Sequence, residues 1–525
     1  MKLVTVAEMQ AIEKEAHSLG ITYDLMMENA GRGLADVILN EFAADKDSGI
    51  LGLVGSGNNG GDTLVALAHL AEKGWKATAC IVRPRPPDDP LVTRLIRLGG
   101  MVFQIADDAN LAQLKELLNQ NAILLDGILG TGFRLPLKSD LARYMEFIKS
   151  TITSKVVPPI VLAVDCPSGI DCDSGDAAPE CIPANITITM AAYKRGLLMF
   201  PANLFVGDIC LVGIGLPEGG ETLNSWSSLK TFVVNADYVR NNLPRRPPDA
   251  HKGTFGTALI VAGSLSYTGA ALLAGQSAYR IGAGLVTLAI PSPLHSALAG
   301  QIPEATWIPL PHEDGYFSPS GIDSLLGNLH LATAVLIGPG FGIRDCTARF
   351  IQDFIASIYQ NNKLSLNLVF DADGLKLLSK VPEWNLRLRN PAVLTPHPGE
   401  MSILTEITKE DIQSNRIEIA LRFSREWGHV VVLKGAFTVV ASPDGDLALI
   451  PVATPALARA GTGDVLAGAI VGLLAQGLKP FPAAVCGAWL HAQAGLAASK
   501  VIGNTASVLA GDILSAIPRV LSDVA

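Results

Sequence analysis

Short runs of consecutive apolar residues recur along the whole chain, and each run ends in glycine, proline or a polar residue. In the first half they occupy residues 50–54, 77–82, 122–126 and 160–165. In the second half they occupy residues 257–262, 334–337, 367–370, 393–395 and 430–433. Runs without polar alternation are typical of parallel β-strands that are buried on both faces.

Helical patterns separate these runs. Thr5 and Glu8 have the spacing of a capping box, which predicts that a helix begins there. Further helices are expected at residues 25–31, 63–73, 267–271 and 465–475. Because strands and helices alternate in both halves, the sequence predicts an α/β fold with two doubly wound domains. The first is expected to be a Rossmann-like three-layer sandwich.

A break in this pattern divides the chain. Proline and glycine interrupt it at residues 216–220, a polar stretch follows at 225–231, and residues 243–248 are rich in proline. We place the boundary at about 217–230, with domains at residues 1–220 and 228–525. A chain of 525 residues is also too long for one typical core.

Composition excludes several classes of protein. Hydrophobic residues make up 49% of the chain and charged residues only 17%, which favours buried sheets over disorder. The formal net charge is −9 and no basic stripe is visible, so we expect no nucleic-acid partner. The seven cysteines form no CxxC pair, which favours reduced thiols and argues against a disulfide framework or a zinc site.

The sequence gives no sign of secretion or of a membrane span. Glu8, Glu13 and Glu15 stand where a secretory signal would need an apolar run. The apolar stretches near the C-terminus are interrupted by polar residues, among them Lys479 and Lys500. We therefore expect a cytoplasmic protein.

The segment Gly461-Thr462-Gly463-Asp464 precedes the apolar helical run at residues 465–475. The two glycines allow a ligand to approach the backbone, and the helix N-terminus attracts anions such as phosphate. A carboxylate in such a place repels phosphate unless a metal bridges them or it transfers a proton. Asp464 is therefore a candidate general base, and the alternative is an N-cap aspartate.

The loop after the first strand contains a GxGxxG pattern at Gly55, Gly57 and Gly60. This pattern allows an NAD-binding redox domain as an alternative. Such a domain should also have an acidic residue after the next strand, but that strand is followed by Arg83 and Arg85. The arginines would suit a ribose phosphate.

Two further strands of the first half end in aspartate. Asp126 precedes the loop at residues 127–133, and Asp165 precedes a loop that contains Ser168. Because the carboxyl ends of parallel strands line the ligand crevice, these residues and Asn59 are expected to converge. The alternative for either aspartate alone is a turn or cap residue.

Four segments of the first half carry a family resemblance: LMMENAG (25–31), GSGNNGGDTLVAL (55–67), DGILGTG (126–132) and VDCPSGID (164–171). Together they resemble the NAD(P)HX epimerase domain, also found in apolipoprotein A-I-binding proteins, over most of residues 1–216. The resemblance implies that the dinucleotide is held by Asn58, Asn59, Gly60, Gly61, Asp62, Gly130, Thr131 and Gly132. It also implies an acid/base role for Asp165 and a potassium ion on oxygens of Asn59, Asp126 and Ser168. Cys166 stands where the family usually has an apolar residue.

Loops of the second half carry another resemblance, at residues 338–342, 371–374, 396–400, 434–438 and 461–464. They resemble the NAD(P)H-hydrate dehydratase domain, a ribokinase-like fold, over roughly residues 230–515. The resemblance implies an adenine nucleotide, with Mg²⁺, on Lys434, Gly435, Ala436, Phe437, Thr438 and Gly463. It implies that Ala270, Gly340, His397 and Asp464 face the hydrated nicotinamide. For His397 alone, the alternative is a packed loop histidine.

The two resemblances imply a bifunctional repair enzyme for hydrated NADH and NADPH, which epimerises the R and S hydrates and dehydrates the S form with ADP or ATP. We expect it to be a homo-oligomer. The alternative is a ribokinase-like small-molecule kinase fused to a dinucleotide-binding module. No Walker A motif occurs, so a P-loop nucleotide site is excluded.

Overall fold

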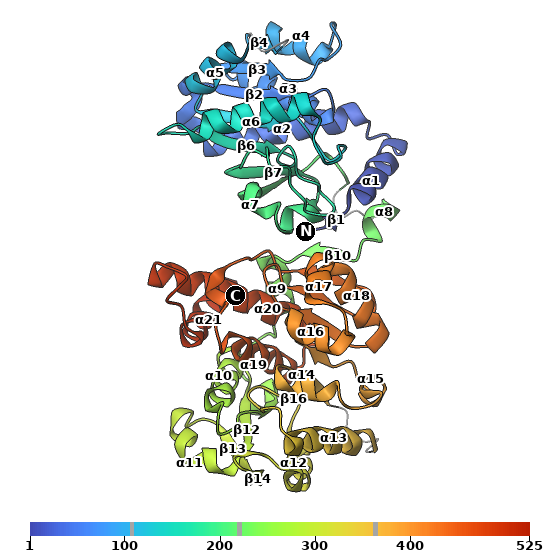
Figure 1. Cartoon of the computed structure of the whole chain (residues 1–525), viewed down its shortest axis with the longest axis vertical. Helices are drawn as coiled ribbons and strands as arrows, with labels where there is room; N and C mark the ends of the chain where they lie inside the picture. Colours follow the sequence, from blue (N-terminus) through green and yellow to red (C-terminus); the bar gives the residue numbers. More distant parts are fainter. Residues whose placement is uncertain (106–109, 218–222, 361–365, 525) are drawn as a thin grey trace. The chain divides into compact units, whose positions relative to one another are not determined.

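A computed structural model describes residues 1–105, 110–217, 223–360 and 366–524. The chain divides into two compact units, Met1–Leu229 and Lys230–Ala525 (Figure 1). Residues 218–222, which include part of the expected boundary, lie outside the described residues.

Unit 1 is built on a sheet of parallel strands in the order β4-β3-β2-β5-β6-β7-β9. The strands are β2 (Ile50–Val54), β3 (Ala77–Ile81), β4 (Met101–Gln104), β5 (Ile123–Gly127), β6 (Ile160–Val164), β7 (Ile186–Met190) and β9 (Asp208–Val212). A separate parallel pair consists of β1 (Leu3–Val4) and β8 (Tyr193–Lys194). The apolar runs predict β2, β3, β5 and β6 within a residue or two. They do not predict β4, β7 and β9.

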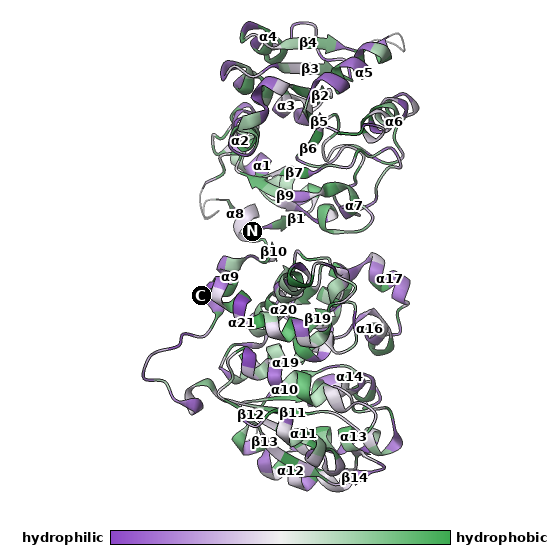
Figure 2. Ribbon diagram, turned by 90° about the vertical axis from the view of Figure 1, so that its left-hand side faces the viewer, coloured by the Kyte–Doolittle hydropathy of each residue, from purple (hydrophilic) through white to green (hydrophobic). Residues whose placement is uncertain are grey.

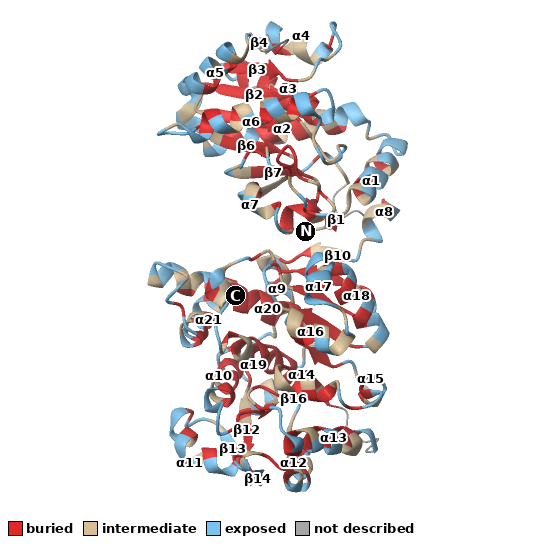
Figure 3. Ribbon diagram, in the orientation of Figure 1, coloured by how far each residue is buried: buried red, intermediate tan, exposed pale blue. Residues whose placement is uncertain are grey.

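Helices cover both faces of this sheet. They are α1 (Val6–Ser18), α2 (Tyr23–Glu41), α3 (Asn58–Glu72), α4 (Pro90–Arg97), α5 (Leu111–Gln120), α6 (Ser139–Thr153), α7 (Asn203–Val206) and α8 (Asn224–Ser227). Alternate residues of β2 join different cores: Ile50 and Val54 pack with α2 and α3, whereas Leu51 and Leu53 pack with α5 and α6. Burial on both faces explains why the strand is apolar throughout (Figure 3).

Unit 2 contains a larger mixed sheet in the order β10-β21-β20-β19-β18-β17-β16-β11-β12-β13, with β20 antiparallel to both of its neighbours. The strands are β10 (Thr231–Val233), β11 (Thr257–Val261), β12 (Leu285–Pro291), β13 (Thr306–Leu310), β16 (Ala334–Ile337), β17 (Asn367–Phe370), β18 (Val393–Leu394), β19 (Val430–Leu433), β20 (Val439–Ala441) and β21 (Leu447–Leu449). A short antiparallel pair consists of β14 (His312–Glu313) and β15 (Tyr316–Phe317).

The helices of unit 2 also form two layers. One core contains α10 (Thr268–Arg280), α19 (Thr462–Ala475), α20 (Pro480–Ile502) and α21 (Ala510–Val524). The other contains α12 (Ile322–Asn328), α13 (Asp345–Gln360), α14 (Asp373–Leu378) and α15 (Trp384–Arg387). The remaining helices are α9 (Ala236–Asn242), α11 (His295–Leu298), α16 (Pro398–Thr405), α17 (Lys409–Ser414) and α18 (Arg416–Trp427). The predicted α/β class with two doubly wound sheets is confirmed.

Hydrophilic residues lie on outer helices such as α4 and α17 (Figure 2). In the described part of the chain, none of the helices combines the length and the apolar character that crossing a membrane requires.

Three predicted helix starts can be compared with the structure. The capping box of Thr5 and Glu8 is present. Helix α3 begins at Asn58 and not at Thr63, and α19 begins at Thr462 and not at Val465. The segments 58–62 and 462–464 are therefore first helical turns, not loops.

Candidate active sites

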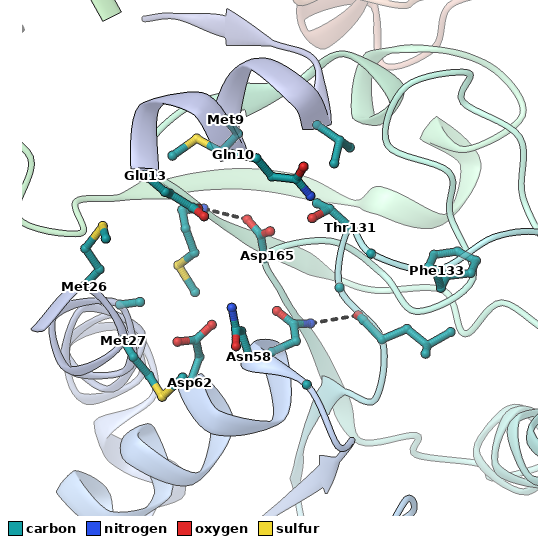
Figure 4. A pocket seen from close by; sticks show the side chains of 18 of the residues that line it. Met9, Gln10, Glu13, Met26, Met27, Asn58, Asp62, Thr131, Phe133 and Asp165 are labelled. Carbon is teal, nitrogen blue, oxygen red and sulfur yellow. Dashed lines mark hydrogen bonds between the residues drawn. The ribbon is translucent and has the colours of Figure 1, made fainter. Parts of the chain in front are cut away.

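Unit 1 has a cavity of about 550 Å³ at the carboxyl ends of its strands. Its wall includes residues that follow β2, β3, β5, β6 and β7, and the side chains of α1 and α2 cover it (Figure 4). This is the crevice where ligands bind in open α/β sheets. The predicted residues on its wall are Asn58, Asn59, Asp62, Gly130, Thr131, Gly132 and Asp165.

Two predicted binding residues, Gly60 and Gly61, do not line this cavity. A Cβ atom on Gly60 would lie 2.1 Å from the carbonyl oxygen of Gly55, and one on Gly61 would lie 2.7 Å from Sδ of Met27. Both glycines therefore let α3 pack closely against its neighbours. Gly57 caps α3 without a side-chain bond, so the first N–H groups of the helix have no capping side chain.

Asp165 is held in a fixed orientation at the centre of the cavity. Its Oδ1 atom accepts hydrogen bonds from the Met190 N–H at 3.0 Å, from the Thr189 hydroxyl at 3.2 Å and from the Lys194 ammonium. Oδ2 accepts none from a described residue. The backbone of Asp165 has φ of 64°, a value that few residues other than glycine adopt. One carboxylate oxygen is thus left to face a ligand.

Lys194 is buried, with 1% of its surface exposed. Besides Asp165, its ammonium group contacts the carbonyl of Met190 at 2.7 Å and the hydroxyl of Thr189 at 3.1 Å. The sequence analysis missed this residue. The only signal is a lysine among apolar residues just after β7, at residues 191–194.

Two more carboxyl groups line the same cavity, those of Glu13 on α1 and Asp62 on α3 (Figure 4). Burial raises the pKa of Asp62 well above its usual value, and the charges of Asp165 and Glu13 raise it further. Burial also raises the pKa of Glu13, against the opposing effect of Lys194. Asp62 and Glu13 therefore each hold a proton more readily than a free carboxylic acid does, because the pKa of each is raised.

Asp126 and Ser168 do not line the cavity and are completely buried. The Ser168 hydroxyl donates to Oδ1 of Asp126 at 2.5 Å, and its backbone N–H donates to Oδ2 at 2.8 Å. Nearby, the Asn59 side-chain amide contacts the carbonyl oxygens of Leu129 at 2.8 Å and of Val164 at 2.6 Å. The predicted trio is therefore brought together around a set of backbone and side-chain oxygens. Burial raises the pKa of Asp126, although the bonds from Ser168 oppose this.

Unit 2 has a charged cluster at the carboxyl ends of β17, β18 and β19. Nζ of Lys434 lies 2.6 Å from Oδ1 of Asp371 and 3.6 Å from Oε2 of Glu400. Burial lowers the pKa of Lys434, but the two carboxylates outweigh burial and leave it raised. Neither Asp371 nor Glu400 was a predicted site residue, although both stand in the loops that carry the resemblance.

Asp464 is the third residue of α19, and Gly461 is the N-cap with φ of 87°. The alternative that Asp464 is the N-cap is therefore wrong. Burial and the neighbouring Asp371 raise the pKa of Asp464 to about 7, although Lys434 opposes them. A Cβ atom on Gly463 would lie 3.6 Å from Nζ of Lys434, so the first turn of α19 borders the charged cluster. A carboxyl group that titrates near neutrality is suited to proton transfer.

The predicted nucleotide residues Lys434, Gly435, Ala436, Thr438 and Gly463 line a cavity of about 170 Å³ beside this cluster. Phe437 is buried and does not line it.

Ala270 and Gly340 lie against each other, since a Cβ atom on Gly340 would be 2.8 Å from that of Ala270. His397 caps α16, and its Nδ1 atom accepts from the backbone N–H groups of Gly399 and Glu400. It has a structural role whether or not it contacts a ligand.

Comparison with known proteins decides the family. The sequence model described as NAD(P)H-hydrate dehydratase matches residues 258–519, and the one described as YjeF-related protein N-terminus matches residues 24–196. A bifunctional NAD(P)H-hydrate repair enzyme from Moorella thermoacetica is 36% identical, over 100% of this chain and 97% of its own length. One from Salinibacter ruber is 35% identical, over 99% and 96%. The chain belongs to the family of bifunctional NAD(P)H-hydrate repair enzymes.

Solved structures are similar to parts of the chain. An ADP/ATP-dependent NAD(P)H-hydrate dehydratase from Bacillus subtilis, co-crystallised with ATP and Mg²⁺, is 30% identical, with a TM-score of 0.46 over 56% of this chain and 98% of its own. A ribokinase-like protein from Enterococcus faecalis is 25% identical, with a TM-score of 0.47 over 56% and 96%. Membership of the repair family does not favour the alternative of a small-molecule kinase fused to a dinucleotide-binding module.

Proposed function

We propose that this chain repairs hydrated NADH and NADPH by two activities. Unit 1 interconverts the R and S hydrates, and unit 2 converts the S hydrate to NADH or NADPH while it consumes ADP or ATP. The observation that carries the proposal is the orientation of Asp165, whose Oδ1 has three donors and whose Oδ2 is left for a substrate. It lies in a chain that is related over its whole length to repair enzymes.

The hydrate carries its hydroxyl on a ring carbon that is bonded to the ring nitrogen. In unit 1, Oδ2 of Asp165 takes the hydroxyl proton, the carbon–oxygen bond becomes a carbonyl, and the carbon–nitrogen bond breaks with its electron pair on nitrogen. Closure on the other face of the carbonyl and return of the proton give the opposite epimer. Lys194 keeps Oδ1 fixed throughout, so the base stays aimed at the hydroxyl.

A potassium ion fits unit 1 because every ligand atom that the proposed site offers is an oxygen. Asp126, Ser168, the side chain of Asn59 and the carbonyls of Leu129 and Val164 would hold it. The side-chain oxygen and nitrogen of an asparagine are assigned from their partners. With its amide turned over, Asn59 would offer its oxygen to such a cation. Such an ion would fix the loops after β5 and β6, and it would supply positive charge to the site.

In unit 2, Asp464 takes the proton of the S hydrate's hydroxyl, and that oxygen attacks the terminal phosphoryl group of ADP or ATP. The N-terminus of α19 and Lys434 stabilise the negative charge on the phosphoryl oxygens. Phosphate is a better leaving group than hydroxide. The ring nitrogen then expels it, and loss of a proton from the adjacent carbon restores the dihydronicotinamide.

Mg²⁺ usually binds through nucleotide phosphates and one or two carboxylates. Asp371 and Glu400, which flank Lys434, offer carboxylate oxygens at this end of unit 2. When bound there, the ion would neutralise charge on the transferred phosphoryl group.

A homo-oligomer remains a prediction, which light scattering of the full chain would check.

The test is to incubate the full chain with a mixture of R and S NADH hydrate and with ADP or ATP. The proposal predicts reduced cofactor, which absorbs in the near ultraviolet, and one released phosphate for each NADH formed. A stable phosphorylated product without NADH would instead support the small-molecule kinase.

A further inference from the structure

Among the described residues that line the cavity of unit 1, two carry a cationic side chain, Lys194 and Arg83. Lys194 is paired with Asp165. Arg83 is partly exposed, and its guanidinium makes no hydrogen bond or ion pair with a residue that the structure describes. An arginine without a partner in a cavity wall is suited to bind an anionic group of a ligand.

The neighbouring arginine is already engaged. Nε of Arg85 donates to Oδ2 of Asp89 at 2.6 Å, and its Nη1 atom donates to the carbonyl oxygens of Gly55 at 2.8 Å and Gly57 at 3.2 Å. Arg85 therefore fixes the glycine turn after β2, and it does not line the cavity. Of the two arginines that follow β3, Arg83 is the one available to a substrate.

Arg83 lies where a dinucleotide site distinguishes one ribose from another. It follows β3, and its backbone N–H donates to the Val54 carbonyl oxygen at 3.5 Å, just before the glycine turn. In doubly wound dinucleotide sites, an acid after this strand binds the 2′-hydroxyl of the adenosine ribose, whereas an arginine accommodates a 2′-phosphate. The carboxylates among the described lining residues are Glu13, Asp62 and Asp165, and none of them follows β3.

The order of the strands places Arg83 at a suitable distance from Asp165. Arg83 follows β3 and Asp165 follows β6, with β2 and β5 between these strands. At the usual spacing of strands the two positions are about 14 Å apart. The N-terminus of α3, which follows β2 and has no capping side chain, suits the pyrophosphate between them. A dinucleotide with its hydrated ring at Asp165 would therefore extend its adenosine ribose toward Arg83.

We propose that Arg83 binds the 2′-phosphate of the NADPH hydrates, so that unit 1 prefers these hydrates to those of NADH. The inference rests on the proposed function, because it takes this cavity as the epimerase site. Hydrogen bonds between a guanidinium and a phosphate are about twice as strong as those between neutral groups. The NADH hydrates have a hydroxyl in place of this phosphate and offer Arg83 no charge.

Epimerisation by the full chain tests the proposal. The R hydrate of NADH or of NADPH is supplied without ADP or ATP, so that unit 2 does not consume the S product, which is measured by chromatography. The wild type should have a KM for the NADPH hydrate about ten- to a hundredfold lower than for the NADH hydrate, the effect expected of a charged hydrogen bond. The kcat values should be similar, because the phosphate lies far from the reacting carbon.

The Arg83→Met variant should raise the KM for the NADPH hydrate by that factor and leave the KM for the NADH hydrate unchanged. Arg83→Lys, which keeps the charge, should recover part of the preference. Arg97→Met is the matched control, because Arg97 is an exposed arginine of α4 that does not line the cavity. It should change neither KM.

Calorimetric titration of the full chain with NADP⁺ and with NAD⁺ requires no turnover. Arg83→Met should weaken the binding of NADP⁺ about ten- to a hundredfold and leave that of NAD⁺ unchanged. Any change on this substitution belongs to unit 1, whichever dinucleotides unit 2 binds.

The inference is overturned if the wild type treats the two hydrates alike, or if Arg83→Met changes neither KM nor affinity. An equal loss for both dinucleotides would place Arg83 at the pyrophosphate and would also overturn it. A wild type that shows the predicted binding but epimerises neither hydrate would contradict the proposed function and leave the role of Arg83 intact.

Discussion

Lys194 and Asp165 form a buried ion pair in which the lysine contacts only one of the two carboxylate oxygens. The lysine side chain is 2% exposed and the aspartate side chain 13%. Asp165 lines the cavity of unit 1. The pair therefore holds the carboxylate in one orientation and leaves its second oxygen accessible to a substrate.

Replacing Lys194 with Met should slow epimerisation by about ten- to a hundredfold, because Oδ1 loses its charged donor and the base loses its orientation. It should also destabilise unit 1 by about 3–5 kcal/mol, since a buried carboxylate is left without its cation. Epimerisation rates and urea unfolding measure the two effects. Lys149→Met, which removes an exposed contact to the carbonyl of Pro179, is the control and should change neither. Full epimerase activity in Lys194→Met would contradict the positioning role.

Replacing Asp464 with Asn should lower the rate of dehydration about a hundred- to ten-thousandfold, the usual loss when a general base is removed. Nucleotide affinity should change little, because Lys434 and the helix N-terminus remain. Epimerisation in unit 1 should be unaffected. Near wild-type dehydration in this variant would show that Asp464 is not the base.

The pH dependence of dehydration should follow Asp464. Its pKa is raised to about 7, and a base acts only when deprotonated, so the rate should rise as pH increases through about 7 and then level off. The folded state binds this proton more tightly than the unfolded chain does. The stability contributed by the protonated group is therefore lost as pH rises toward 7, and Asp464→Asn should melt at a higher temperature than the wild type at pH 8. A rate independent of pH between 6 and 8 would exclude this assignment.

Removal of potassium should slow epimerisation but not nucleotide binding. The oxygens around Asn59, Asp126 and Ser168 suit a hard cation, and a bulky organic cation would not fit among buried groups. The measurement is the epimerisation rate after exhaustive exchange into such a buffer and after potassium is returned. Unchanged rates throughout would mean that no potassium ion is needed.

The strands and the aspartates that follow them could be predicted because each leaves a local pattern. A strand buried on both faces is apolar at every position, as β5 and β6 are, and the residue after it lies at the crevice. Asp126 and Asp165 were found in this way.

Lys194 and the starts of α3 and α19 could not be predicted, because they depend on distant parts of the chain. A buried lysine is tolerated only beside its partner, and Asp165 is 29 residues away. Asparagine, glycine and threonine are poor helix formers, so residues 58–62 and 462–464 suggest loops. In α3 the first turn is packed closely, since a Cβ atom on Gly60 would lie 2.1 Å from the carbonyl oxygen of Gly55.

The central claim is that the two units act in sequence on one substrate mixture. Asp165→Ala in the full chain should remove epimerisation and leave unit 2 intact, because the hydrogen bonds of the Asp165 carboxylate to described residues are made with Thr189, Met190 and Lys194 of unit 1. A chiral site that aligns a hydroxyl with both a phosphoryl group and a base accepts one epimer.

The most direct measurement is therefore the extent of NADH formation from an R and S hydrate mixture with excess ATP. The wild type should convert the whole mixture. Asp165→Ala should convert the S fraction at the wild-type rate and then stall, apart from slow spontaneous epimerisation. Adding the full-length Asp464→Asn variant, whose unit 1 is unchanged, should restart it. Complete conversion by Asp165→Ala at the wild-type rate would contradict the account.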